Sequence, residues 1–500
     1  MSSPAISLYT KCIQIDRRKS TPLYLQVVYQ FIQAIQRQLL EEGDQLPGSR
    51  PLSRALGIHR KTLIAALEEL ETQGWVQSVP AVGTYIKNPE HLPKKGKNSL
   101  QAALPDTSGF NYRKSFLLDA TPSSFADKLK FTDGTPDYRI LKPTELGRFY
   151  SSLLKRKNNL QNRLDPAGRN TGFFYEQLSF YLNTTRGFHC SKNHLLITES
   201  RQVLLYILTQ LLIQKGDLVL VEEYGYPLAN MIFQQAGAQL HTIPIDQEGI
   251  QVDHIAQQYR AGQIRLLFIQ PQHQYPTTSC LSAQRRHKLI KLATELDFII
   301  VEDEEFSELT YEKSTPLSLI KHAHQGKLIH LGSFGKFLLP GFQANFMLGP
   351  KDFITEAHKY LPIFNPPDPL KDRARGEMID EGDIHRYRRK AIQAYTARRN
   401  LFSALLLQQE LSEIFQYTPP KGGWAFWLKV KQPFSLSKLV ENCRTKGLLI
   451  PRVCLYQNRT ITALRLGFGH LNEREMKESI HLLHQALRTS AQKINDPLSK

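Results

Sequence analysis

One lysine and one acidic residue, each following an apolar run, have the types and positions needed for imine chemistry. Lys336 ends the string Gly332-Ser333-Phe334-Gly335-Lys336, which follows the apolar run Leu328 to Leu331. A lysine held in a pocket at a strand end can lose its proton and attack an aldehyde to form a Schiff base. Asp303 follows a second run, Phe298 to Val301. Because a carboxylate keeps a protonated pyridine nitrogen charged, Asp303 is the predicted partner of a heterocycle at this site.

Strands separated by helices must bring these two residues together. From Phe131 onward, short apolar runs alternate with amphipathic helical segments, a pattern that predicts an α/β domain with a mostly parallel sheet covered on both faces. The runs are Leu195 to Thr198, Leu218 to Glu222, Leu266 to Ile269, Phe298 to Glu302 and Leu328 to Leu331. Ligands of open α/β sheets lie at the carboxyl ends of the strands, so Asp303 and Lys336 are expected at one such edge.

A second segment with functional potential lies near the N-terminus. Apolar residues recur at helical spacing after Pro22 up to Gly43, which is expected to end the helix. Two further helices are predicted from about Ser49 to Leu56 and from near His59, and two strands, Trp75 to Val79 and Thr84 to Ile86, would form a wing. Helix, tight turn and helix in so short a space predict a helix-turn-helix DNA reader.

The residues predicted to contact DNA lie at the starts of the two helices and in the wing. The start of the last helix would reach base edges or phosphates, the start of the preceding helix would meet the backbone, and the wing tip would approach the minor groove. In that order, these residues are Arg60, Lys61 and Thr62, then Ser49 and Arg50, then Gly83.

Size and composition agree with this organisation. The chain has 500 residues, more than one hydrophobic core usually organises, so at least two domains are expected. Its net charge of +18 favours a polyanionic partner such as nucleic acid. Five scattered cysteines without a CxxC pair predict neither disulfides nor a metal site and fit a reducing cytoplasm. No signal core and no long apolar stretch is present, so neither secretion nor a membrane span is predicted.

A change of composition marks the domain boundary. Residues 88–128 carry several Pro and Lys residues with little apolar periodicity, as in a solvated linker. We therefore predict a DNA-binding domain at 12–87 and a second domain at 129–490. The second domain is expected to have a large subdomain at about 165–365 and a smaller C-terminal α+β subdomain at about 375–490.

The N-terminal segment resembles the winged-helix domain of the GntR family over its whole length. The matching residues are Pro22-Leu23-Tyr24, Leu46-Pro47, Ser49-Arg50, Leu56-Gly57, Arg60-Lys61-Thr62, Leu70, Gly74 and Gly83-Thr84-Tyr85. The resemblance implies binding of double-stranded DNA.

The remainder, from Phe131 to about Leu487, resembles the aminotransferase-like domain of fold-type-I pyridoxal-phosphate (PLP) proteins. With the winged helix attached, the whole chain resembles a MocR/GabR-type regulator. The matching pieces are Gly134-Thr135-Pro136-Asp137, Asp165-Pro166-Ala167-Gly168, Arg186-Gly187, Gly216-Asp217, Glu222, Tyr226-Pro227, Gly237-Ala238, His273-Gln274-Tyr275-Pro276-Thr277, Glu302-Asp303, Gly332-Ser333-Phe334 with Lys336, Gly382 to Arg389 with His385, and Leu464-Arg465-Leu466-Gly467-Phe468.

The resemblance implies a role for each matching residue. Lys336 would hold PLP as an internal aldimine, Asp303 would pair with the ring nitrogen, and Tyr226 would stack on the ring. Arg465 would clamp the carboxylate of an effector by a bidentate contact. The remaining positions that the resemblance places around the cofactor are Ser200, Arg201, Gln202 and Tyr275, with Ser333 and the helix start at Gln202 meeting the phosphate.

Several cofactor positions depart from the family pattern. Gln343 replaces the phosphate-binding arginine and Glu305 replaces the tyrosine that meets the ring hydroxyl, while Gly335, Thr278 and the pair Ser200-Arg201 replace other family residues. One hypothesis is that Arg201 and Arg163 supply the lost positive charge to the phosphate. The alternative is a site that no longer binds the cofactor.

These observations favour a cytoplasmic, homodimeric transcription regulator. An amino compound would displace Lys336 by forming an external aldimine and thereby alter DNA binding. Two alternatives stay open, namely a working PLP-dependent aminotransferase that carries a DNA-binding domain, and a cofactor-free DNA-binding scaffold whose large domain only dimerises.

Overall fold

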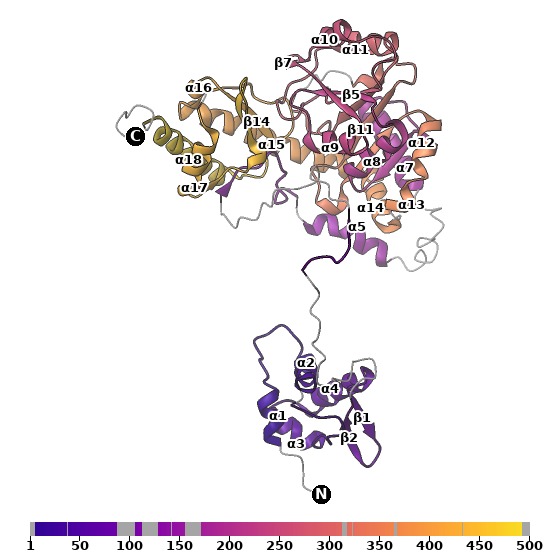
Figure 1. Ribbon diagram of the computed structural model, residues 1–500, viewed down its shortest axis with the longest axis vertical. Coiled ribbons are helices and arrows are strands. Elements are labelled where there is room, and N and C mark those ends of the chain that lie inside the picture. Colours follow the sequence, from indigo (N-terminus) through magenta and orange to yellow (C-terminus); the bar gives the residue numbers. More distant parts are fainter. Residues whose placement is uncertain are drawn as a thin grey trace. The chain divides into compact units, whose positions relative to one another are not determined.

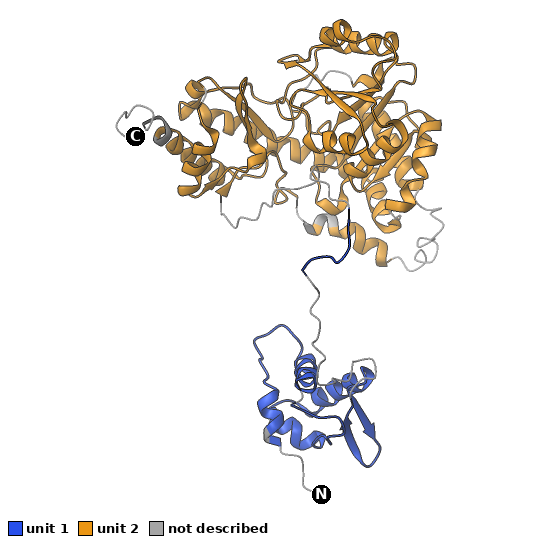
Figure 2. Ribbon diagram, viewed as in Figure 1, with its two compact units in different colours: residues 1–114 blue, residues 115–500 orange. Residues whose placement is uncertain are grey.

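The computed structural model describes residues 6–37, 39–87, 106–112, 129–141, 143–155, 172–312, 318–322, 324–364, 368–432 and 434–492. The chain divides into two compact units, Met1–Lys114 and Ser115–Lys500 (Figures 1 and 2). Each unit has its own hydrophobic core, so each is described by itself.

Unit 1 is a winged helix-turn-helix. Its elements are α1 (Ile6–Cys12), α2 (Leu23–Gln36), α3 (Ser49–Ala55), α4 (Arg60–Thr72), β1 (Val76–Val79) and β2 (Gly83–Ile86), and the two strands pair antiparallel. The apolar faces of the helices meet in one core around Val28, Phe31 and Leu63, none of which is exposed. The sequence pattern predicted α3, α4 and the wing, because their caps and apolar spacing are local signals.

Two features of unit 1 differ from the prediction. The end predicted for the first helix at Gly43 is wrong, because α2 stops at Gln36 and the backbone N–H of Arg37 bonds to the carbonyls of Gln33 and Ile35. Leu40 nevertheless reaches the same core from the loop that follows, which explains why the apolar pattern continues past the helix. The second difference is α1, a helix that the sequence did not predict and that brings Tyr9 to the core.

A seven-stranded sheet forms the centre of unit 2. Its strand order is β4 (Leu195–Thr198), β12 (Ala344–Leu348), β11 (Leu328–Phe334), β10 (Ile299–Glu304), β9 (Leu266–Ile269), β5 (Leu218–Glu222) and β6 (Gln239–Ile243). Only β12 runs antiparallel to its neighbours, so the predicted mostly parallel sheet is confirmed.

Helices cover both faces of this sheet, as Figure 1 shows. Side chains on one face, such as Leu196 and Phe268, pack against α8 (Arg201–Leu212), α9 (Pro227–Gln235) and α12 (Lys351–His358). The residues that precede these in the sequence point to the other face of the sheet. Leu195 packs with α7 (Gly172–Arg186), α14 (Pro369–Asp380) and the first half of α15 (Asp383–Gln408). Leu267 packs with α10 (Val252–Gln258) and α11 (Ala283–Glu295). Burial on both faces explains why these strands are continuously apolar.

A smaller α+β subdomain follows, as predicted. Its antiparallel sheet has the order β13 (Phe415–Gln416), β14 (Ala425–Val430), β17 (Thr462–Gly467) and β16 (Leu455–Gln457), and it packs with α17 (Leu436–Thr445) and α18 (Glu473–Gln492). The remaining strands and α-helices of the described residues are β3 (Leu129–Lys130), paired with β15 (Leu448–Leu449), the pair β7 (Ile245–Asp246) and β8 (Gly249–Ile250), and the helices α5 (Pro143–Lys155), α13 (Leu361–Phe364) and α16 (Leu411–Ile414). No helix within the described ranges combines the length and the apolar character needed to cross a bilayer.

Candidate functional site

The carboxyl ends of β10 and β11 bring Asp303 and Lys336 together. The two strands are parallel neighbours with Asp303 opposite Leu331 and Glu304 opposite Gly332, and Lys336 follows the end of β11 by two residues. Both residues therefore lie at the sheet edge at which the sequence predicted a site. The arrangement depends on a tight turn, because Gly335 has a φ of +65°, a conformation that glycine adopts without steric cost.

Four charged side chains form a continuous network at this edge. The ammonium of Lys336 pairs with Glu305, the guanidinium of Arg201 pairs with Glu305 at 2.5 Å, and Arg201 also pairs with Asp303. The side chains of Arg201 and Asp303 are only 9% and 1% exposed. Burial raises the pKa of the Glu305 carboxyl, but the positive charges of Lys336 and Arg201 outweigh that effect and hold the pKa at about 2. The network therefore combines two cations with two anions.

Arg201 also lies against the aromatic side chain that the sequence placed over a cofactor ring. Its guanidinium carbon is 4.8 Å from the centre of the Tyr226 ring, a cation–π distance. Tyr226 precedes α9 and packs edge-on against Tyr275, with ring centres 5.6 Å apart. The guanidinium thus contacts an aromatic face and the carboxylates of Asp303 and Glu305 at once.

Side chains predicted to meet a phosphate are bonded within the protein. Ser333 donates its hydroxyl to the carbonyl of Glu305 at 3.0 Å, and Ser200 donates to the side chain of Gln202 at 2.6 Å. The amide of Gln343 donates to the carbonyl of Leu338 at 2.6 Å. Arg163, the other arginine proposed for the phosphate, lies outside the described residues.

A fully buried arginine, Arg375, bonds to the backbone beside the predicted phosphate position. Arg375 donates to both carboxylate oxygens of Glu199, at 2.7 and 2.9 Å, and also bonds to the carbonyl of Gln343. Lys371 pairs with the same carboxylate at 3.2 Å. Arg375 and Lys371 therefore share the carboxylate of Glu199, and Asp372 and Asp368 supply further negative charge beside them.

Arg465 joins the small sheet to the loops of the large subdomain. It is 2% exposed, and it donates to the carbonyls of Asp133 and Pro276, each at 2.7 Å, while its guanidinium carbon lies 4.7 Å from the Tyr275 ring centre. These bonds hold Arg465 beside Tyr275, whose hydroxyl accepts a hydrogen bond from Tyr456 at 2.9 Å. Its predicted role toward an effector carboxylate stays a prediction.

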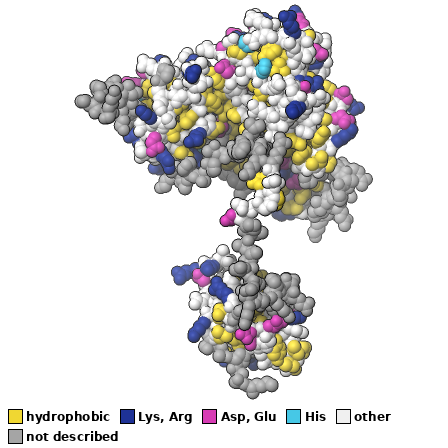
Figure 3. Space-filling view, in the orientation of Figure 1, with side chains coloured by type: hydrophobic (Ala, Val, Ile, Leu, Met, Phe, Trp, Pro, Cys, Tyr) yellow, Lys and Arg dark blue, Asp and Glu magenta, His cyan; other side chains and the backbone are white. Residues whose placement is uncertain are grey.

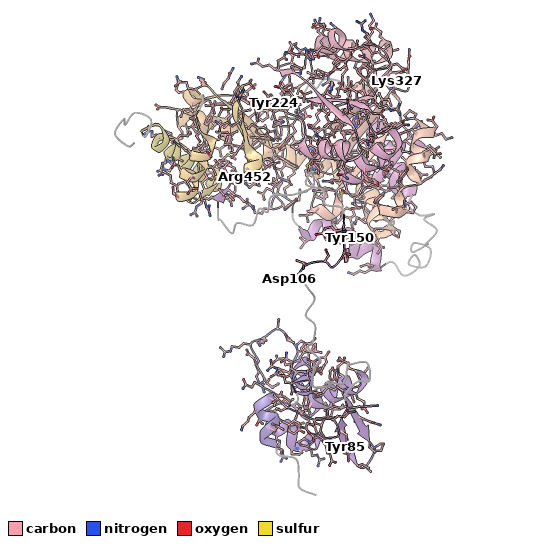
Figure 4. The ribbon with its side chains drawn as sticks, in the orientation of Figure 1. Tyr85, Asp106, Tyr150, Tyr224, Lys327 and Arg452 are labelled. Carbon is pink, nitrogen blue, oxygen red and sulfur yellow. The ribbon has the colours of Figure 1, made fainter. Side chains whose placement is uncertain are left out.

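A second aromatic contact links the same two subdomains. Tyr224, labelled in Figure 4, lies 6.5 Å from Trp427 of β14, measured between ring centres. The two contacts place the small sheet beside the loop that follows β5 and the loop that contains Tyr275.

The sequence did not predict the buried polar groups beneath the site. Glu222 is 3% exposed, and burial raises the pKa of its carboxyl to about 8, although the backbone of Gln270 and the side chain of Gln274 donate hydrogen bonds to it. Glu302, Glu304 and His330 have donor atoms close enough to hold a cation. They are engaged internally, because Glu302 accepts bonds from Ser318 and the backbone of Leu319 and pairs with His330, while Glu304 pairs with Arg186.

One signal for the charged network was present in the sequence. Arg201 and Glu305 are both departures from the family pattern, and they carry opposite charges. Such reciprocal departures are compatible with a contact between the two residues, but no local pattern favours Glu305 over a phosphate as the partner of Arg201.

In unit 1, the residues predicted to read DNA gather where α3 and α4 begin. Arg60 donates to the hydroxyl of Ser49 at 3.2 Å, which joins the first turns of the two helices. Arg50, Arg60 and Lys61 are exposed, whereas Thr62 is half-buried. His59 precedes α4 and its ring accepts a hydrogen bond from the backbone of Lys61. The basic side chains are therefore presented at the end of α4 that enters the major groove in helix-turn-helix proteins.

Backbone conformation and a close contact explain the glycine at position 83 in the wing. Gly83 has a φ of +147°, and a Cβ at this position would lie 2.4 Å from the side-chain amide nitrogen of Gln45. At the turn, Val79 and Val82 are 39% and 59% exposed, and Figure 3 shows hydrophobic side chains gathered at this edge of unit 1. Tyr85, labelled in Figure 4, lies on β2. The predicted contact of Gly83 with DNA stays a prediction.

Comparisons with known proteins agree with the two-domain arrangement. The family described as aminotransferase class I and II matches residues 171–483, and the family of bacterial regulatory proteins named gntR matches residues 23–86. The uncharacterized HTH-type transcriptional regulator YdeL of Bacillus subtilis is 25% identical over 477 residues, which cover 94% of this chain and 98% of YdeL. The probable rhizopine catabolism regulatory protein MocR of Rhizobium meliloti is 25% identical over 405 residues, 78% of each chain.

A solved structure shows the same fold. It is the alpha-aminoadipate aminotransferase LysN of Thermus thermophilus, complexed with N-(5'-phosphopyridoxyl)-L-leucine. Its TM-score is 0.64 at 22% identity, and the match covers 73% of this chain and 93% of LysN. The fold-type-I architecture is thereby confirmed, and the two family matches together with YdeL and MocR confirm the resemblance to regulators of the MocR type.

The side chains described at the sheet edge do not fit PLP, the cofactor that this fold implies. Asp303 already pairs with Arg201, and Glu305 places a carboxylate where the family has a tyrosine hydroxyl. Lys336 pairs with Glu305, so its amine would have to leave this carboxylate before it could attack an aldehyde. The predicted contacts with the ring nitrogen, the ring hydroxyl and the aldehyde are therefore all altered.

Proposed function

Because the chain belongs to the aminotransferase class I and II family and joins that domain to a GntR-family domain, we propose that it regulates transcription in response to a small amino compound. Unit 2 binds the compound, and the resulting change in unit 2 alters DNA binding by unit 1. A regulator of this kind acts in the cytoplasm, where its DNA lies, and as a homodimer it presents two readers to paired half-sites. The proposal does not require a bound cofactor.

The observation that carries the proposal is the exposed basic end of α4. Arg60 and Lys61 are held in place by contacts with Ser49 and His59 at the first turns of α3 and α4, and both project from the helix end that reads base edges in this fold. Relatives that match nearly the whole length of the chain are named as transcriptional regulators, which supports the same function.

The choice of an amino compound rests on the match of unit 2 to the aminotransferase family, whose members act on amino compounds. Arg465 is the residue that the resemblance assigns to the carboxylate of such a compound. A working aminotransferase, the second candidate, is disfavoured by the ion pair of Lys336 with Glu305, because imine chemistry needs a neutral amine.

Selection of DNA from a random pool tests the proposal. Full-length protein is incubated with random-sequence duplexes, and bound duplexes are amplified and sequenced over several rounds. We expect a defined motif, and we expect Arg60→Ala to weaken binding to it by about tenfold or more, the effect of losing one base contact. Lys477→Ala, which removes the same charge from α18 in unit 2, is the matched control and is expected to bind as the wild type does.

Two outcomes of this experiment would contradict the proposal. If no motif is enriched, or if Arg60→Ala and Lys477→Ala bind DNA equally well, unit 1 is not a sequence-specific reader and the proposal fails.

A further inference from the structure

We propose that the site at the sheet edge has exchanged its cofactor for an internal ion-pair network, in which the guanidinium of Arg201 takes the place of the PLP ring. The chain then works as a regulator without PLP. This inference rests on the aminotransferase-like domain of the proposed function, but it does not depend on DNA binding.

The first argument is the set of contacts that Arg201 makes. A pyridinium ring in this fold needs an aromatic face and a carboxylate, and the resemblance assigns these contacts to Tyr226 and Asp303. The guanidinium of Arg201 contacts both, as a planar cation 4.8 Å from the Tyr226 ring centre and in an ion pair with Asp303. A planar cation of the same charge therefore already satisfies the two groups that would hold the ring.

Burial makes this replacement stable. The Arg201 side chain is 9% exposed and the Asp303 side chain 1%, so neither charge is well solvated. A cofactor ring would have to displace the guanidinium from both carboxylates, and the displaced cation would lose its partners in a poorly solvated pocket. Leaving a buried charge without its partner is strongly unfavourable.

Glu305 adds electrostatic repulsion. Its carboxylate bridges Arg201 and Lys336, and these cations keep its pKa at about 2, so it is ionised at neutral pH. The oxygen of the PLP ring hydroxyl, which is deprotonated in the bound cofactor, would lie beside a carboxylate instead of the hydroxyl of a tyrosine. Two adjacent negative charges repel each other.

Among the described residues, the position that carries the phosphate-binding arginine in the family carries no charge. Gln343 is neutral and its amide is bonded to the carbonyl of Leu338. Arg375 and Lys371 both pair with Glu199, and they also lie within ion-pair distance of Asp372 and Asp368 respectively. The described residues therefore compensate a phosphate dianion poorly at this position.

The first experiment asks whether the wild type takes up PLP. The full-length protein is incubated with excess PLP, reduced with borohydride and analysed by mass spectrometry, with Lys336→Ala as the control. We expect no phosphopyridoxyl adduct on Lys336 and no absorbance band at about 400 to 430 nm that Lys336→Ala abolishes. A stoichiometric adduct on Lys336 would overturn the inference.

The second experiment tests the part assigned to Arg201. The triple variant Arg201→Ser, Glu305→Tyr, Gln343→Arg restores the family pattern at three positions, and the double variant Glu305→Tyr, Gln343→Arg differs from it only in keeping Arg201. Circular dichroism confirms that both fold. We expect the triple variant to bind PLP at least tenfold more tightly than the double variant. Equal binding by the two variants, or no binding by either, would show that Arg201 is not what excludes the ring.

DNA binding separates this inference from the proposed function. We expect the selected motif to be bound equally well with and without added PLP. If the wild type does not bind DNA, the proposed regulator is contradicted and the cofactor result stands. If PLP forms an adduct on Lys336, the cofactor inference is contradicted and the proposed regulator stands.

Discussion

Single residues decide the chemistry of the site through the charges they place next to one another. Lys336 and Asp303 are the residue types that imine chemistry needs, but each has an oppositely charged neighbour, Glu305 and Arg201 respectively. Because Arg201 contacts both acids, neither acid is free to hold a heterocycle. The function of a lysine in this fold therefore depends on what pairs with it as much as on its position.

The pairing of Asp303 with Arg201 predicts a specific effect on stability. We expect Asp303→Asn to lower the free energy of unfolding by about 1 to 3 kcal/mol, because the buried Arg201 loses one of its two carboxylate partners and keeps Glu305. The double variant Arg201→Gln, Asp303→Asn should lose less than the sum of the single variants. Urea unfolding of all three proteins measures the coupling, and Lys477→Ala, which breaks an exposed pair, should change stability by less than about 1 kcal/mol. Additive losses would show that the pair is not coupled.

Glu222 predicts a pH dependence with a definite sign. Burial raises the pKa of its carboxyl from 4.5 to about 8 in the folded protein, so the folded state binds a proton more tightly than the unfolded state. The wild type is therefore most stable with respect to this group below pH 4.5 and loses that stability as the pH rises toward 8. Glu222→Gln keeps a neutral side chain and does not titrate. Its stability relative to the wild type should increase by roughly 3 kcal/mol between pH 5.5 and 8, measured by urea unfolding. A constant difference would contradict the raised pKa.

At the scale of elements, the packing of β11 against β12 explains a glycine in the lysine motif. Gly332 lies opposite Phe346 in the antiparallel register, and a Cβ on Gly332 would lie 2.3 Å from the Phe346 ring. Both residues are buried. The glycine therefore allows a large side chain of β12 to cover the strand that delivers Lys336.

A glycine substitution tests this packing. We expect Gly332→Ala to destabilise unit 2 by about 1 to 3 kcal/mol, because overpacking forces strand or ring to move. Gly341→Ala is the matched control, since no atom lies within 4 Å of the Cβ it would add, and it should change stability by less than about 0.5 kcal/mol. Thermal unfolding followed by circular dichroism compares the two, and equal melting temperatures would contradict the close approach.

At the scale of the whole molecule, the chain couples two independently packed units. Unit 1 has a core of its own around Phe31 and Leu63, and unit 2 buries its sheet between helices on both faces. Lysine and arginine exceed the acidic residues by +18 over the full chain. Such a balance favours binding of a polyanion by the whole protein, with specificity supplied by the few residues at the start of α4.

This charge predicts a steep dependence of DNA binding on salt. We expect the affinity of the full-length protein for a selected duplex to fall at least tenfold between 50 and 200 mM salt, because bound phosphates release counterions. Lys61→Ala should lower the slope of log affinity against log salt by about 1 if Lys61 contacts a phosphate. Fluorescence anisotropy titrations measure both slopes, and a flat salt response would contradict binding dominated by phosphates.

The sequence by itself determined the two domain types, the mostly parallel sheet and the meeting of Asp303 with Lys336 at one sheet edge. These features are readable because caps, apolar periodicity and strand order act locally or follow general rules of connection. It missed α1 and the end of α2, whose limits depend on the core that Tyr9 and Leu40 share.

Only the tertiary structure decided what Arg201 faces. From the first turn of α8, its side chain could serve a phosphate or an acid, and no local pattern distinguishes the two. The fold brings the end of β10 within reach, where Asp303 and Glu305 supply two negative charges in a poorly solvated pocket. A buried cation pairs with the nearest anions, and that choice depends on distances between segments about a hundred residues apart in the chain.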